Sequence, residues 1–144
     1  MNLLKGWEID AKDITVLEII GHGSFGIVHL GNLHGMQVAI KKIAASATTK
    51  EKAQAVHMLN REVKALSRCR HKNIVQLIGC CSNPPMLILA YAANGTLRDL
   101  LNQDIPLLPS RKMEIIHGCC DGMAMLHSQN VLHLDLKPEN VLIA

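Results

Sequence analysis

The sequence predicts an α+β fold in which a five-stranded antiparallel sheet is followed by helices. Five short runs rich in β-branched and other apolar residues, separated by turn signals, occupy the first two thirds of the chain. Two longer segments instead carry apolar residues at helical spacing. The 144 residues are 49% hydrophobic and 19% charged, which suits one ordinary domain, or part of a larger one, with a buried core.

The predicted strands are separated by recognisable turns. His34-Gly35 suits a tight hairpin turn, and Asn83-Pro84-Pro85 is a strong break. The first three strands are expected to pair antiparallel because the connections between them are short. The five strands are expected at residues 14–20, 27–31, 36–42, 75–80 and 86–91.

One helix is predicted between the third and fourth strands, within residues 50–68. Val56, Leu59, Val63 and Leu66 follow one another at steps of three, four and three residues, which places them on one helical face. The helix therefore has a side that can pack on the sheet.

Two further helices are predicted after the sheet. Thr96 can cap a short helix through Gln103, and prolines then break the chain until Ser110 caps a longer helix through about Gln129. In the longer helix, Gly118 and Gly122 suit close packing. Its apolar face, on which Ile116, Cys119, Met123 and Leu126 lie, is expected to be exposed unless later helices cover it. Short strands are expected at 131–132 and 141–143.

Charge and cysteine content exclude several classes of protein. The formal net charge of +3 is small and dispersed, so we expect no nucleic acid partner. No apolar run approaches the roughly 20 residues of a membrane span, and the N-terminus does not resemble a signal peptide. The five cysteines are odd in number and lack zinc-ligand spacing, so buried, reduced thiols and a cytoplasmic location are expected.

Residues 21–26 form the pattern Gly-His-Gly-Ser-Phe-Gly. In a dinucleotide-binding fold the third glycine would open a helix, whereas here Ile27 continues as a strand. A glycine loop between antiparallel strands can still bring backbone N–H groups close to phosphate oxygens. An ordinary structural turn is the alternative.

Lys41 ends the run Val-Ala-Ile-Lys and shares a strand face with Ala39. Glu62 borders the apolar face of the first helix, so its carboxylate could reach a cation on the sheet. The alternatives are a solvated surface lysine and a glutamate paired on its own helix.

Taken together, these residues resemble the protein kinase family from the glycine loop to the end of the chain. Gly21, Gly23, Gly26 and Val28 match its nucleotide loop, Lys41 its phosphate-binding lysine and Glu62 the partner of that lysine. The stretch 89–97 is similar to the hinge between kinase lobes, although the usual acidic residue would fall at Ala90. The resemblance implies ATP as cofactor, held by Ile20, Gly21, Gly23, Ser24, Phe25, Gly26, Val28, Ala39, Lys41, Glu62, Leu89, Ala90 and Ala92.

Residues 133–140, His-Leu-Asp-Leu-Lys-Pro-Glu-Asn, resemble the kinase catalytic loop. The resemblance implies that Asp135 accepts the proton of a substrate hydroxyl and that Lys137 neutralises charge on the moving phosphoryl group. Asn140 would hold one Mg²⁺, and His133 would be a scaffold residue. A solvated turn is the alternative interpretation of this loop.

Two departures from the family pattern affect what is expected. Leu134 replaces the arginine that commonly binds a phosphorylated activation loop, so regulation by that phosphate is not expected. The 144 residues also contain no Asp-Phe-Gly, which supplies the other metal ligand in the family, so the chain is expected to be inactive alone.

The sequence is therefore interpreted as a partial protein kinase domain, residues 1–144, of the tyrosine-kinase-like or receptor-like Ser/Thr branch. It would comprise an N-terminal lobe (1–89), a hinge (90–95) and the start of a C-terminal lobe (96–144). The expected function is ATP- and Mg²⁺-dependent phosphorylation of Ser/Thr hydroxyls of a protein substrate. A non-catalytic nucleotide-binding or interaction module that pairs with a full-length kinase is the alternative, and an incomplete gene model is a third.

Overall fold

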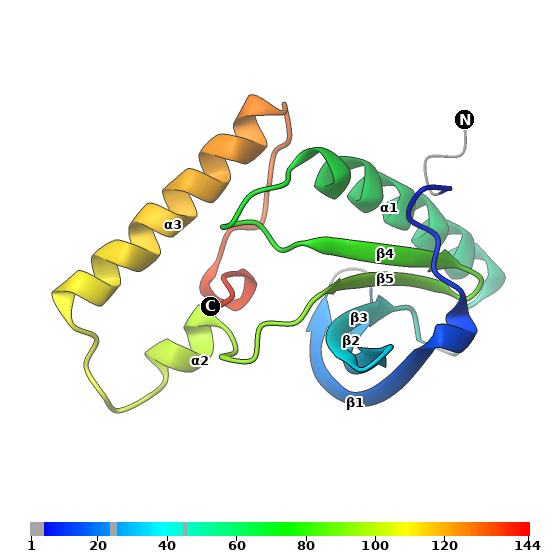
Figure 1. Ribbon diagram of the computed structural model, residues 1–144, viewed down its shortest axis with the longest axis horizontal. Helices are drawn as coiled ribbons and strands as arrows, with labels where there is room; N and C mark the ends of the chain where they lie inside the picture. Colours follow the sequence, from blue (N-terminus) through cyan, green and yellow to red (C-terminus); the bar gives the residue numbers. More distant parts are fainter. Residues whose placement is uncertain (1–4, 24–25, 45) are drawn as a thin grey trace. The chain divides into compact units, whose positions relative to one another are not determined.

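A computed structural model of the chain forms two compact units (Figure 1). The sheet unit takes in residues 1–68 and 76–91, and the helical unit takes in residues 69–75 and 92–144. The structure describes residues 5–23, 26–44 and 46–144.

The sheet unit contains the predicted five-stranded antiparallel sheet. Its strand order is β1-β2-β3-β5-β4, so sequence neighbours pair except where β5 lies between β3 and β4. The α+β prediction is confirmed: the third strand has the expected bounds, and the ends of the other strands differ from those expected by up to three residues. The strands are β1 (Ile14–Gly23), β2 (Gly26–Leu33), β3 (Met36–Lys42), β4 (Leu77–Ser82) and β5 (Pro85–Ala90).

The predicted turn at His34-Gly35 joins β2 to β3. Both residues have positive φ, 49° and 86°, as a two-residue hairpin turn of the type matched to strand twist requires. The side chain of Asn32 accepts a hydrogen bond of 2.8 Å from the Gly35 N–H and so closes the turn. Local side-chain chemistry therefore fixes the register of this hairpin.

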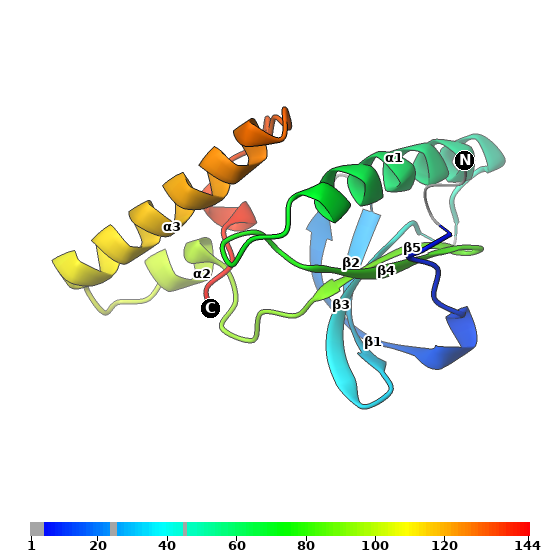
Figure 2. The ribbon, with the colours of Figure 1, turned by 45° about the horizontal axis from the view of Figure 1, so that its top comes forward.

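The helix α1 (Thr49–Arg68) lies across one face of β4 and β5, as Figures 1 and 2 both show. Leu59 and Val63 from the helix are buried, in agreement with the predicted apolar face. Leu87 and Leu89 of β5 are buried too. Burial of such side chains stabilises the unit by about 1.5–3 kcal/mol each.

The opposite sheet face has its own core, formed by Leu33, Val38, Ile40, Cys81, Met86 and Ile88. Ile9, Ala11 and Ile14 pack against it from the segment that contains the short helix η1 (Ala11–Asp13). Alternation of side chains along each strand separates this core from the face under α1.

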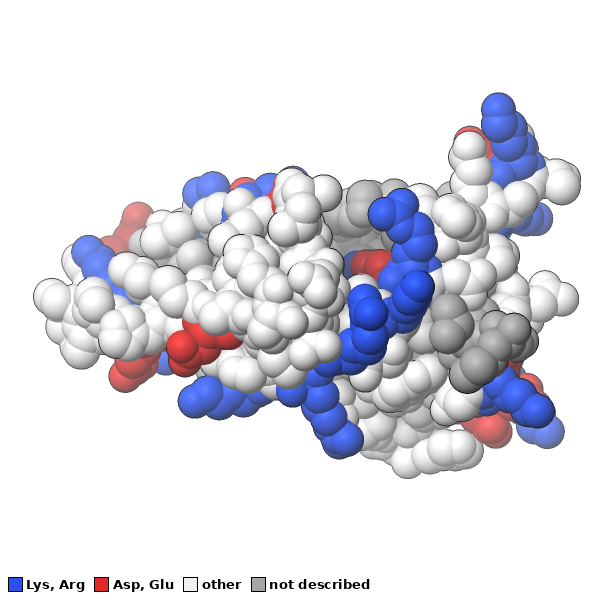
Figure 3. Space-filling model, turned by 90° about the horizontal axis from the view of Figure 1, so that it is seen from above, with Lys and Arg blue, Asp and Glu red and all other residues white. Residues whose placement is uncertain are grey.

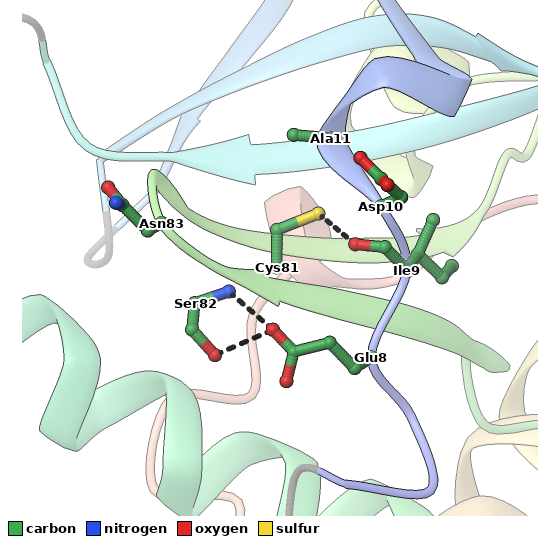
Figure 4. Close-up of a pocket in the computed structure, with 7 residues that line it drawn as sticks. All are labelled: Glu8, Ile9, Asp10, Ala11, Cys81, Ser82 and Asn83. Atoms are coloured by element: carbon green, nitrogen blue, oxygen red, sulfur yellow. Dashed lines mark hydrogen bonds between the residues drawn. The ribbon is translucent and has the colours of Figure 1, made fainter.

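The N-terminal segment also covers the β4 edge of the sheet. Ile9 N–H donates to the Cys80 carbonyl and Cys80 N–H donates to the Trp7 carbonyl, at 2.8 and 2.9 Å. Figure 4 shows the neighbouring hollow, where Glu8 accepts hydrogen bonds from the Ser82 backbone and hydroxyl. Edge coverage of this kind blocks pairing with a foreign strand.

In the helical unit, α2 (Leu97–Leu101) begins as predicted and ends earlier than Gln103. Thr96 and Asp99 form a capping box in which each side chain binds the other's backbone N–H. The pKa of Asp99 is lowered because its carboxylate accepts hydrogen bonds from the Thr96 N–H and, as the second contribution, from the Thr96 hydroxyl. The cap is therefore built from an ionised carboxylate.

The long helix α3 (Pro109–Ser128) corrects one prediction about its start. Leu108, not Ser110, is the N-cap, because Pro109 takes the first helical position, where its missing N–H costs no hydrogen bond. A Cβ on Gly122 would lie 2.8 Å from the Asn73 carbonyl, which confirms the expected close packing. No helix in the described part of the chain is long and apolar enough to cross a membrane.

The prediction of short strands at 131–132 and 141–143 was wrong. Residues 131–132 have no regular structure, and Leu142 makes only an isolated bridge with Thr96. Two backbone hydrogen bonds, from Leu97 N–H to Val141 O and from Ile143 N–H to Gly95 O, hold this segment. A single bridge satisfies these groups without a ladder.

The apolar face of α3 and the cysteines follow the expectations in part. Ile116 is 51% exposed, whereas Cys119, Met123 and Leu126 are partly buried. The thiols are free, as expected, and Cys69, Cys80 and Cys81 are buried, but Cys119 is partly buried and Cys120 is exposed. Burial raises the pKa of Cys80 and of Cys81 to about 11, with a smaller contribution to Cys80 from the negative charge of Glu8.

Candidate active site

Four adjacent strands, β1, β2, β3 and β5, place several predicted site residues in one row across the sheet. Gly21 pairs with Val28, Val28 pairs with Lys41, and Lys41 pairs with Leu87 of β5. Directly opposed residues in an antiparallel sheet project to the same face. Ala39 and Leu89 also pair with each other, two residues from Lys41 and Leu87 along β3 and β5, and therefore share this face.

The side chains of Lys41 and Glu62 meet on this face. The Lys41 Nζ atom donates to Glu62 Oε1 at 3.1 Å, with the two side chains 28% and 37% exposed. Since Glu62 lies on α1, this ion pair joins the helix to the middle of the sheet. An ion pair this exposed stabilises the fold by no more than about 1 kcal/mol, so stability alone explains little of the arrangement.

The second carboxylate oxygen of Glu62 has no hydrogen-bond partner among the described residues, although it is enclosed. The first oxygen is already held by Lys41. An enclosed carboxylate oxygen can accept one further N–H or O–H donor. The site therefore has an acceptor position beside the lysine.

The glycine loop contains positions with different steric requirements. A Cβ on Gly23 would have open space around it, whereas a Cβ on Gly26 would overlap the Lys42 carbonyl oxygen. Gly26 also has a φ of +148°, which other residues rarely adopt. Gly26 is thus required by the fold itself, while Gly23 leaves room above the backbone. Ser24 and Phe25 lie outside the described residues.

The remaining predicted nucleotide contacts are Ile20, Ala90 and Ala92. Ile20, near the end of β1, is 43% exposed. The Ala90 N–H at the end of β5 donates to the Gln76 carbonyl at 2.9 Å, so only other groups of this residue are left for a ligand. Ala92 belongs to the helical unit, where its carbonyl accepts from the Gly95 N–H.

In the helical unit, the predicted catalytic residues cluster beside the short helix η2 (Pro138–Asn140). The Asn140 amide nitrogen donates to the Asp135 backbone carbonyl at 2.8 Å and to its carboxylate at 3.1 Å. The Lys137 amine lies 3.4 Å from the same carboxylate. The structure therefore brings all three residues together around Asp135, which remains 62% exposed at its side chain.

The loop before Asp135 is shaped by His133 and Leu134. The His133 Nδ1 atom accepts from the Asp135 N–H at 3.2 Å, as a scaffold residue would. Leu134 has a φ of 65° and a side chain that is largely exposed. A left-handed backbone conformation at a non-glycine residue costs about 1–3 kcal/mol of folding free energy, which other interactions of the loop must offset.

One contact of the loop was not predicted. Arg98 of α2 donates to Glu139 of η2 at 2.7 Å. This hydrogen bond is the main reason why the pKa of Glu139 is lowered. No sequence pattern links two residues 41 positions apart, so only the folded chain could reveal that α2 holds the loop.

The oxygen atoms of the loop fit a magnesium ion in part. With its nitrogen donating to Asp135, the Asn140 amide leaves its oxygen available, next to the Asp135 carboxylate. Mg²⁺ prefers such oxygen ligands and usually completes its shell with water and phosphate. Within the described ranges, no three His, Cys, Asp or Glu side chains are grouped to hold a metal by themselves. A metal here would depend on a phosphate ligand.

Comparisons with known proteins agree with this geometry. Residues 14–144 match the protein kinase domain family. The chain is 39% identical to human mitogen-activated protein kinase kinase kinase 7 over 142 residues, which are 94% of this chain and 22% of that protein. It is 39% identical over 164 residues to the L-type lectin-domain containing receptor kinase VI.1 of Arabidopsis thaliana, covering 97% of this chain and 23% of the relative. The chain thus spans less than a quarter of the length of these relatives.

Proposed function

Because this chain belongs to the protein kinase domain family, we propose that it binds Mg-ATP and takes part in phosphoryl transfer to Ser/Thr hydroxyls of proteins. The observation that carries the proposal is the 3.1 Å pair of Lys41 and Glu62, on the sheet face that also presents Val28 and Ala39. An amine held by a carboxylate in this way is positioned to bind phosphate oxygens.

We assign nucleotide binding to the sheet unit. Lys41 donates to phosphate oxygens while Glu62 fixes the direction of its amine. Gly23 carries no side chain of its own, so a phosphate can approach its backbone closely. The apolar side chains of Val28, Ala39 and Leu89 offer a surface for the adenine ring.

We assign proton acceptance and metal binding to the loop of the helical unit. Bound Mg-ATP supplies the activated phosphoryl group and a cation that spreads its charge. Asp135 accepts the hydroxyl proton of the substrate, and Lys137 stabilises negative charge that develops on the phosphoryl oxygens. Asn140 orients the Asp135 carboxylate through its amide nitrogen and offers its amide oxygen to Mg²⁺.

The preference for Ser/Thr hydroxyls rests on two observations. Lys137 lies two residues after Asp135, the spacing of Ser/Thr-specific kinases. A mimivirus relative, 36% identical over 144 residues, carries serine/threonine-protein kinase in its name. A protein substrate follows from the family.

Nucleotide binding by the 144-residue chain tests the first half of the proposal. We expect Lys41→Met to weaken Mg-ATP binding at least about tenfold, the loss expected for one charge-assisted hydrogen bond. Lys42→Met is the matched control, because Lys42 alternates to the other face of β3 and should leave the affinity unchanged. Equal affinities of the wild type and Lys41→Met, measured by titration calorimetry, would contradict the assignment.

Transfer of radiolabelled phosphate to a basic protein tests the second half. Any transfer by the wild type should disappear in Asp135→Asn, while nucleotide affinity stays within about twofold, because Asp135 is assigned the hydroxyl proton. Binding without transfer in the wild type would instead support the non-catalytic nucleotide-binding module.

A further inference from the structure

The solvent side of α1 carries a row of basic side chains. Lys50, His57, Arg61, Lys64 and Arg68 are all exposed, and the last four follow at steps of four, three and four residues. Residues at these spacings lie on one helical face, opposite buried Leu59. We call these five residues the basic stripe. Figure 3 views the molecule from the side of α1 and shows Lys and Arg side chains as a blue band.

The acidic residues of α1 do not neutralise the positive charge of the basic stripe. The helix contains five Lys or Arg and two Glu, a net +3 that equals the formal net charge of the whole chain. Both acids are engaged elsewhere, Glu51 with the Thr48 N–H and Glu62 with Lys41. Within the described residues, no cation of the stripe forms an ion pair.

This arrangement is unfavourable for the helix by itself. Like charges three and four residues apart destabilise a helix, as for Arg61 and Lys64. The helix dipole opposes Lys50 at the N-terminal end, and it favours only Arg68 in the last turn. A surface that serves solubility alone would intersperse both signs of charge. The single sign therefore fits a surface that meets a negatively charged partner.

The neighbours of the stripe favour a protein helix as that partner. Ala53 and Ala65 flank the stripe with small side chains, and Met58 beside them is 38% exposed. Small flanking residues allow helix axes to approach to about 8–10 Å, and an exposed methionine adapts to an apolar contact. Met58 offers an apolar contact that a nucleic acid backbone would leave unused, so a protein helix fits this surface better than nucleic acid does.

We propose that the basic stripe of α1 is a docking surface for an acidic amphipathic helix of a partner protein. Carboxylates at alternating steps of three and four residues on the partner would lie opposite Arg61, Lys64 and Arg68. The interaction is independent of the nucleotide assigned above, because no residue of the stripe is in that site.

The test measures binding of a fluorescein-labelled helical peptide of about 20 residues, with glutamates at that spacing and leucines beside them, by anisotropy. At about 50 mM salt, where screening is weak, Arg61→Glu/Lys64→Glu should weaken binding at least about tenfold. The matched control is Lys52→Glu/Lys112→Glu, which changes net charge equally with two exposed lysines off the stripe. The control should retain affinity within about twofold.

Several outcomes would overturn the proposal. They are absence of peptide binding by the wild type, an equal loss in both variants, and tighter binding of duplex DNA or of phosphatidylserine vesicles than of the peptide. Self-association that the stripe variant abolishes would assign the surface to a second copy and also overturn it. Circular dichroism verifies that both variants fold, so a loss confined to the stripe variant supports docking.

Discussion

Replacing Gly26 by alanine should destabilise the sheet unit whether or not a nucleotide is bound. The added Cβ would overlap the Lys42 carbonyl oxygen and approach the Ile43 Cα to 3.1 Å. Backbone atoms of a paired strand cannot move aside without breaking the ladder between β2 and β3. Overpacking of this kind costs about 1–3 kcal/mol, and the φ of +148° adds about 1–3 kcal/mol of backbone strain for alanine.

The expected total of about 2–6 kcal/mol is a large part of the roughly 5–15 kcal/mol that stabilises an ordinary domain. It should lower the unfolding temperature by about 5–20 °C at this chain length. Trp7 is the single tryptophan, and its carbonyl accepts a hydrogen bond from β4, so its fluorescence reports unfolding of the sheet unit.

Gly23→Ala is the control for this experiment. Apart from Gly23 and its chain neighbours, no atom of the described residues lies within 4 Å of the added Cβ, so the unfolding temperature should change by no more than about 2 °C. The same variant should weaken Mg-ATP binding, because the methyl group occupies the space proposed for a phosphate. If Gly26→Ala and the wild type unfolded at the same temperature, the steric argument would be refuted.

Three further predictions concern packing and titration. Gly122→Ala should destabilise the helical unit by about 1–3 kcal/mol in urea titrations, because the Asn73 backbone carbonyl is in the way, while Gly118→Ala, which meets only the Asn73 side chain at 3.0 Å, should be neutral or stabilising. Iodoacetamide at pH 8 should label exposed Cys120 long before buried Cys80, and mass spectrometry showing equal rates would contradict the burial. Burial raises the pKa of Cys80 from 9.0 to about 11, so the stability that the buried neutral thiol contributes is fully present below pH 9 and is lost as the pH rises through 11. Between pH 9 and pH 11, a Cys80→Ala variant should therefore lose less stability than the wild type.

Much of the architecture could be predicted because it depends on local chemistry. The hairpin at His34-Gly35 follows from a turn type that neighbouring residues specify, and the apolar period of α1 indicates which face is buried. The capping role of Thr96 was predicted for the same reason. In these places the forces act between residues a few positions apart.

The errors occurred where distant segments compete for the same backbone groups. The segment 141–143, which is apolar and contains two β-branched residues, was expected to be a strand. Its hydrogen bonds instead go to the turn around Gly95, so a single bridge replaces a ladder. Ser110 was expected to cap α3, but Pro109 already occupies the first helical position, so Leu108 is the N-cap.

The sequence by itself determined the order of the elements, the buried side of α1 and the residue types available to bind phosphate and to accept a proton. The family resemblance implied that Glu62 pairs with Lys41, and the tertiary structure shows the 3.1 Å contact. Only the tertiary structure decided that Asn140 holds Asp135 and that Arg98 reaches Glu139. The physical reason is range: periodicity and capping act within a few residues. Contacts between side chains 21 or 41 positions apart depend on how strands pair and helices pack, which residue spacing does not encode.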